Sequence, residues 1–242
     1  MKQFLRLLNN DLKRLYEYGI VLFVSILTFV FAMAMAVFPE MDKSNIIYFN
    51  IFVLPVIVFS ISMFISREEN TILPLVMGTV KPIVVVFAKI VSAIIVELIP
   101  IIAFIIIFRF TKFETDYFLL FLIYLLGVTL HIIIALALVI ISKTSSALSI
   151  SYLTYILVFS ATAILYSNGL IPLSAQPFLL ISPAFMSAVL VDNILAISVY
   201  SETWLILLSI ILQFIFGFAL VWFVIKPYFK TYILIQNSKK YD

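Results

Sequence analysis

Three polar side chains stand near the middle of long apolar runs, where an ionisable group usually has a function. Glu97, His131 and Gln213 lie at similar depths, about 16–22 Å from the charged ends of their runs at 1.5 Å per residue. They are therefore expected to form one polar layer. A carboxylate facing lipid is costly, so Glu97 should face the interior and pair with His131. The layer could line a substrate path, or it could be polar glue between helices.

Most catalytic chemistry is excluded by the residues that are missing. The chain has no cysteine, one histidine and five scattered glycines. Thiolate nucleophiles, multi-histidine metal sites, phosphate-cradling loops and Gly-x-Ser-x-Gly elbows are therefore not expected. We expect no catalytic residue, no metal site and no cofactor on this chain, which disfavours an intramembrane enzyme.

A short charged segment, residues 67–81, lies between two apolar runs. It opens with charged side chains and continues with apolar ones before Pro82. This pattern predicts a short amphipathic helix that docks onto a soluble partner; an interfacial loop without a partner is the alternative. The residues expected to make the contact are Arg67, Glu68, Glu69, Thr71, Ile72, Leu73, Leu75 and Lys81.

The composition determines what kind of elements hold these groups. Of 242 residues, 65% are hydrophobic and 11% are charged, with a mean hydropathy of +1.26. A soluble protein of this size could not bury so much apolar surface, whereas lipid can cover it. The sequence predicts an all-α integral membrane protein in one domain, because only helices satisfy their backbone across such runs. The expected spans are 18–38, 45–66, 82–108, 117–142, 145–167 and 203–225.

The first 17 residues have a different pattern. Leu5, Leu8, Leu12 and Leu15 share one helical face, and charged or polar side chains occupy the rest. This predicts an amphipathic helix on the inner membrane surface. The alternative is a charged flank that only sets topology.

The distribution of Lys and Arg predicts the orientation. With the N-terminus in the cytoplasm, the inner side holds Lys2, Arg6, Lys13, Arg14, Arg67, Lys81, Lys89, Lys143, Lys226, Lys230, Lys239 and Lys240, and the outer side holds Lys43, Arg109 and Lys112. Both termini, including the tail 226–242, are therefore expected in the cytoplasm. Lys89 lies slightly inside its span and should extend its ammonium group to the interface. The net charge of +3 thus reflects orientation, and no nucleic-acid partner is expected.

Residues 168–202 are expected to form a long outer segment that dips into the membrane. Pro172, Pro177 and Pro183 interrupt it, and a seventh span would move the C-terminal lysines outside. Within it, Ser182 and Pro183 should be the N-cap and first position of a short helix.

The segment after the second span resembles the first cytoplasmic loop of ABC-2-type transporter permeases. The matching positions are Glu68, Glu69, Thr71, Leu73, Leu75, Pro82 and Lys89, while Asn70 replaces the usual glycine and Pro74 falls inside the segment. The resemblance extends in outline over the whole chain: N-terminal amphipathic helix, six spans, and a long outer segment before the last span.

The resemblance implies a half-transporter in the bacterial cytoplasmic membrane. Two permease copies or paralogues would enclose the path, and soluble ABC ATPase subunits, which hold ATP and Mg, would dock on the coupling segment 67–81. The substrate would be hydrophobic or amphipathic, such as a drug, an amphipathic peptide or a lipid. An ATP-independent carrier or substrate-binding membrane component is the alternative, although no inverted repeat relates the two halves of the chain.

Overall fold

The structure is a computed structural model, and it describes residues 2–38, 43–69, 80–142, 144–167, 170–172, 175–195 and 203–229. Over these residues the fold is entirely helical. Its elements are α1 (Lys2–Glu17), α2 (Ile20–Val37), α3 (Lys43–Glu68), α5 (Pro82–Phe110), α6 (Tyr117–Ile141), α7 (Ser145–Ser167), α8 (Gln176–Leu179), α9 (Pro183–Ile194), α10 (Thr203–Ala219) and the π-helix η2 (Leu220–Ile225), which continues α10.

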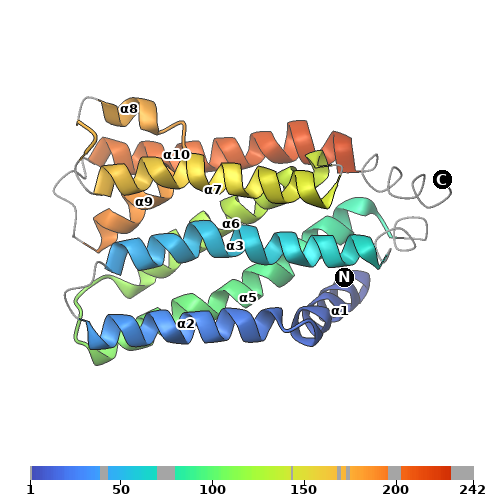
Figure 1. The fold of residues 1–242 in the computed structure, drawn as a ribbon, viewed down its shortest axis with the longest axis horizontal. Helices are drawn as coiled ribbons and strands as arrows, with labels where there is room; N and C mark the ends of the chain where they lie inside the picture. The colour runs from blue at the N-terminus through green and yellow to red at the C-terminus, as the bar shows by residue number, and fades with distance from the viewer. Residues whose placement is uncertain are drawn as a thin grey trace.

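Six of the described helices are long and apolar enough to cross a membrane. They are α2, α3, α5, α6, α7 and α10 with its extension to Phe229, and each overlaps one of the six runs expected from the sequence. These helices indicate a multi-pass membrane protein. α1 and the C-terminal end of α10 lie at the same end of the bundle, as an even number of crossings requires (Figure 1).

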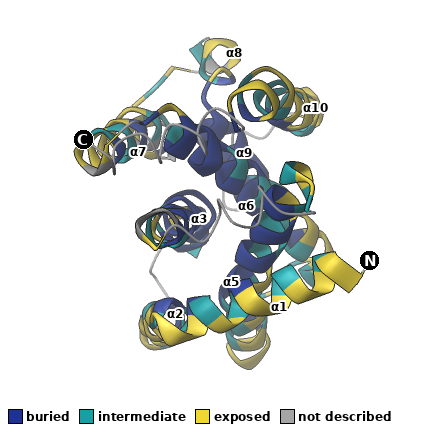
Figure 2. Ribbon diagram, turned by 90° about the vertical axis from the view of Figure 1, so that its right-hand side faces the viewer, coloured by how far each residue is buried: buried dark blue, intermediate teal, exposed yellow. Residues whose placement is uncertain are grey.

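The bundle has a buried centre and an apolar exterior. α3 and α6 pack along each other at the centre, α2 and α5 lie on one side, and α7, α9 and α10 lie on the other (Figures 1 and 2). Large apolar side chains are exposed on the outer helices, among them Leu22, Phe29, Ile150, Leu157, Phe214 and Phe218. A contiguous apolar exterior of this kind is stable in lipid and not in water.

Local signals in the sequence set the ends of several helices. Gly19 has a φ of 71° in the left-handed region, where a residue without Cβ is unstrained, and it ends α1 and lets α2 begin. The Asp116 carboxylate accepts hydrogen bonds from the backbone N–H groups of Phe118 and Leu119 and so caps α6.

α9 is a short helix inside the bundle. The Ser182 hydroxyl accepts from the backbone N–H of Phe185, and Pro183 stands at the start of the helix, which confirms the expected N-cap and first position. α9 packs against α3, α6, α7 and α10, and its first ten residues are buried. With 12 residues it is about 18 Å long, roughly half the thickness of a bilayer core.

Gly127 allows the two central helices to pack closely. A Cβ added at Gly127 of α6 would lie 2.5 Å from Ile51 Cγ2 of α3 and 3.4 Å from Ser187 Oγ of α9. The contact with Ile51 is far shorter than a van der Waals separation, and the contact with Ser187 is at the lower limit of one. Three helices therefore meet at this position because it has no side chain.

We expect Gly127→Ala to destabilise the fold by about 1–3 kcal/mol, because the central helices must separate to admit the methyl group. Gly217→Ala is the matched control, since its Cβ would lie 3.6 Å from Leu130 Cδ1, an ordinary contact. Thermal unfolding of the purified protein in detergent measures the difference. Equal midpoints for the two variants would show that the α3–α6 packing is loose.

Candidate functional site

A buried ion pair joins α1 to α5. Lys89 Nζ lies 2.7 Å from Asp11 Oδ1 and donates a hydrogen bond to it, and the side chains of both residues are at most 9% exposed. The Ser92 hydroxyl donates to the other Asp11 oxygen, Oδ2. Lys89 Nζ also lies 2.8 Å from Ser66 Oγ on α3. We call Asp11, Ser66, Lys89 and Ser92 the junction network, since it links α1, α3 and α5.

The junction network identifies the partners of the Lys89 ammonium group. This group is buried in the protein and is held by Asp11 of α1 and Ser66 of α3. Leaving the charge of a lysine in an apolar region is costly, and here a carboxylate and a hydroxyl reduce that cost. Lys89 therefore links helices, and its position relative to the membrane interface stays a prediction.

The apolar face of α1 packs on protein. Leu15 is buried, Leu8 and Leu12 are partly buried, and α1 contacts α5 and α2. α1 lies across the end of these two helices (Figure 2). Leu5 is 53% exposed and thus does not belong to the packed face. Leu8, Leu12 and Leu15 thus lie on the face that contacts α5 and α2, and the position of α1 on a membrane surface stays a prediction.

A second ion pair connects α1 to the end of α3. The Arg14 guanidinium contacts the Glu69 carboxylate, with both side chains partly exposed. Glu69 is the last described residue before the gap at 70–79. The N-terminal helix is thus tied to the chain at the point where the predicted coupling segment begins.

The structure describes only part of the predicted coupling site. Lys81 is exposed at the N-cap position of α5, and Pro82 begins that helix. Thr71, Ile72, Leu73 and Leu75 lie outside the described residues, as do the side chains of Arg67 and Glu68. The expected helix over 67–81 therefore stays a prediction, except that α3 extends to Glu68.

The expected pair between Glu97 and His131 is wrong. Both residues are fully buried, but within the described ranges neither Glu97 oxygen has a hydrogen-bond partner. The sequence placed Glu97 and His131 at a common depth, but depth along a helix does not determine which face a side chain occupies.

His131 and Gln213 do converge on one turn of α6. His131 Nδ1 lies 2.7 Å from the Gly127 carbonyl oxygen, and Ser187 packs against the same glycine. Gln213 Nε2 donates to Ser187 Oγ at 3.3 Å. His131 and Gln213 are thus connected through Gly127 and Ser187 of α9, a helix that the depth argument did not include, and Glu97 makes no hydrogen bond to either among the described residues.

Within the described ranges, no group of three or more His, Asp or Glu side chains could hold a metal ion. Comparison with known proteins adds nothing further: no family model, no curated protein and no solved structure matches the chain.

Sequence reasoning missed Asp11. A signal was present, because Asp11 shares a helical face with Leu8, Leu12 and Leu15, and an acid among leucines requires a buried partner. Lys89, an isolated base inside an apolar run, is the complementary signal. Sequence spacing alone could not show that the two face each other across 78 residues.

Removing one charge of the junction network should destabilise the protein strongly. We expect Asp11→Ala to cost about 3–5 kcal/mol, because it leaves the Lys89 ammonium buried without its counter-ion. The double variant Asp11→Leu/Lys89→Met should recover most of this loss, since no uncompensated charge remains. Unfolding of the purified protein in detergent gives the free energies.

Glu17→Ala is the matched control on the same helix. It removes an exposed pair, Lys13–Glu17, with side chains 71% and 55% exposed, and should cost less than about 1 kcal/mol. If Asp11→Ala and Glu17→Ala cost the same, the network does not hold α1 on the bundle.

Proposed function

We propose that the chain is the permease subunit of an ATP-driven exporter of the ABC-2 type, which moves a hydrophobic or amphipathic molecule across the bacterial cytoplasmic membrane. One observation carries this proposal: Lys89 of α5 forms a buried ion pair with Asp11 of α1 and a hydrogen bond with Ser66 of α3. These contacts lie at the end of the bundle where residues 70–79 connect α3 to α5. We infer that these three helix ends would move together when one of them is displaced.

The connections determine how a force would travel. A push on residues 70–79 acts directly on α3 and α5, because the segment is covalently continuous with both. The Asp11–Lys89 pair and the Arg14–Glu69 pair carry the same displacement to α1. A soluble ABC ATPase subunit that closes on ATP and Mg would supply the push, and this chain would bind neither ligand itself.

The charge distribution supports an orientation with the junction network at the cytoplasmic end of the bundle. α8 and α9 then lie at the outer end, and α9 becomes a re-entrant helix whose capped N-terminus is held within the protein. The exposed apolar helices leave room for a second permease, identical or paralogous, that completes the path with this chain.

The ATPase partner gives the first test. A tagged chain purified from its native membrane should carry a stoichiometric soluble subunit with Mg-dependent ATPase activity. Leu73→Glu/Leu75→Glu should remove that subunit, because charge is placed in the apolar contact. Leu170→Glu is the control, since Leu170 is 71% exposed in the opposite, outer segment. Export by the purified chain without any nucleotide-hydrolysing subunit contradicts the proposal.

Orientation is tested independently. The chain has no cysteine, so each introduced cysteine is the only thiol. We expect Lys81→Cys to react with a membrane-impermeant maleimide only after intact cells are opened, and Leu170→Cys to react from outside. Labelling of Lys81→Cys in intact cells would place the junction network on the wrong side for an ATPase.

A further inference from the structure

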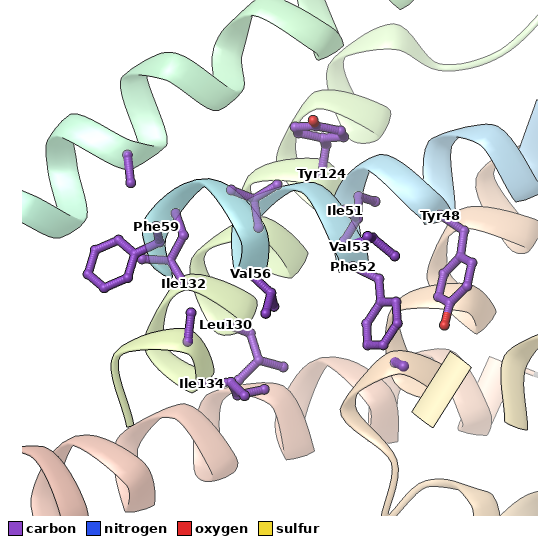
Figure 3. Close-up of a cluster of buried hydrophobic side chains, with 14 of the residues drawn as sticks. Tyr48, Ile51, Phe52, Val53, Val56, Phe59, Tyr124, Leu130, Ile132 and Ile134 are labelled. Atoms are coloured by element: carbon purple, nitrogen blue, oxygen red, sulfur yellow. The ribbon is translucent and has the colours of Figure 1, made fainter. Parts of the chain in front are cut away.

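Five rings form a continuous cluster between α3, α6 and α7. Tyr48 and Phe52 stack on α3 with ring centroids 5.6 Å apart, and Phe52 meets His131 of α6 edge-on at 5.2 Å. Phe52 also lies 5.3 Å from Tyr155 of α7, which lies 4.9 Å from Phe159. We call these five residues the aromatic cluster. Figure 3 shows that Tyr48 and Phe52 project from one side of α3, while Tyr124 lies on the other.

The aromatic cluster contains polar atoms without partners. The hydroxyls of Tyr48 and Tyr155 and the Nε2 atom of His131 are buried, and none has a hydrogen bond within the described part of the chain. A carbonyl can only accept, so His131 Nδ1 donates to Gly127 O, and Nε2 of the neutral ring is a free acceptor. Buried polar atoms are normally satisfied, and several exceptions at one place point to a ligand.

Ring faces make this site favourable for positive charge. The face of an aromatic ring carries negative potential and attracts organic cations. The buried Lys89 ammonium is paired with Asp11, so it brings no uncompensated positive charge into the bundle. The ring faces therefore favour a cation over an anion.

The position of the cluster connects it to the junction network. α3 carries Tyr48 and Phe52 and, further along the same helix, Ser66 of the network. α7 is the least buried of the six spans, judged on its described side chains. A displacement of α3 relative to α7 would separate Phe52 from Tyr155 and expose both ring faces.

We propose that the aromatic cluster is the binding site for an amphipathic organic cation with an apolar, aromatic body and hydrogen-bonding groups, and that the site is closed in this structure. As a transport site it rests on the proposed function, because α3 must be moved to open it. As a binding site it requires no other protein, because thermal displacement of α3 relative to α7 is enough to admit a ligand to the isolated chain.

Two ions of nearly equal size and opposite charge test the proposal. Tetraphenylphosphonium should bind the purified chain in nanodiscs saturably, and tetraphenylborate should not compete for that site. Phe52→Leu and Tyr155→Leu should each weaken tetraphenylphosphonium binding about tenfold, because a ring face is lost. Phe118→Leu is the matched control, since Phe118 is 72% exposed on α6, and it should leave the affinity unchanged.

Tyr155→Phe protects the test against misfolding, because it keeps the ring and removes only the hydroxyl. It should leave tetraphenylphosphonium binding within about twofold, yet weaken the hydrogen-bonding cation rhodamine 6G about fivefold, the effect of one hydrogen bond. Unsaturable binding, competition by tetraphenylborate, or equal affinities for Phe52→Leu and Phe118→Leu each overturn the proposal.

The same assay separates this proposal from the proposed function. The binding assay contains no ATPase. Saturable binding that depends on Phe52 would therefore support the binding site even if no ATPase subunit co-purifies with the chain. The chain would then be a binding or carrier component. Conversely, an ATPase that co-purifies and drives export while no binding depends on Phe52 would support the proposed exporter function and contradict the proposed binding site.

Discussion

No water reaches the hydrocarbon core of a membrane, so the polar groups inside this bundle depend on the protein for their hydrogen bonds. Several hydroxyls bond within their own helix: Ser25 donates to the Val21 carbonyl at 2.8 Å, and Ser151 donates to the Ala147 carbonyl at 2.8 Å. A lysine cannot satisfy its ammonium in that way. Lys89 requires another helix, and Asp11 of α1 supplies the counter-charge.

That requirement turns an amphipathic helix into part of the bundle. Leucines alone would hold α1 on any apolar surface, because apolar contacts have no preferred direction. The ion pair and its two serines fix one register of α1 against α3 and α5, which is the best-attested role of buried polar groups. The partly exposed Arg14–Glu69 pair contributes less to stability, but it connects α1 to the segment after α3.

The lack of water also applies at the centre of the bundle, but there some polar groups have no described partner. Gly127 brings α3, α6 and α9 together, and Ser187 and Gln213 bond to each other there. Beside them, the buried phenol hydroxyls of Tyr48 and Tyr155 have no hydrogen-bond partner among the described residues. The structure thus combines a satisfied polar junction at one end of α3 with an unsatisfied aromatic cluster nearer the other, and α3 joins the two.

Apolar runs of about 20 residues determined the six spans by themselves, because length and hydropathy are properties of a local stretch. Ser182 and Pro183 likewise determined the start of α9, since capping acts between neighbouring residues. Only the tertiary structure decided that Lys89 faces Asp11, that Glu97 does not face His131, and that rings from three helices meet at Phe52. These contacts depend on how each helix is rotated about its axis, and that rotation is set by the packing of all its neighbours together.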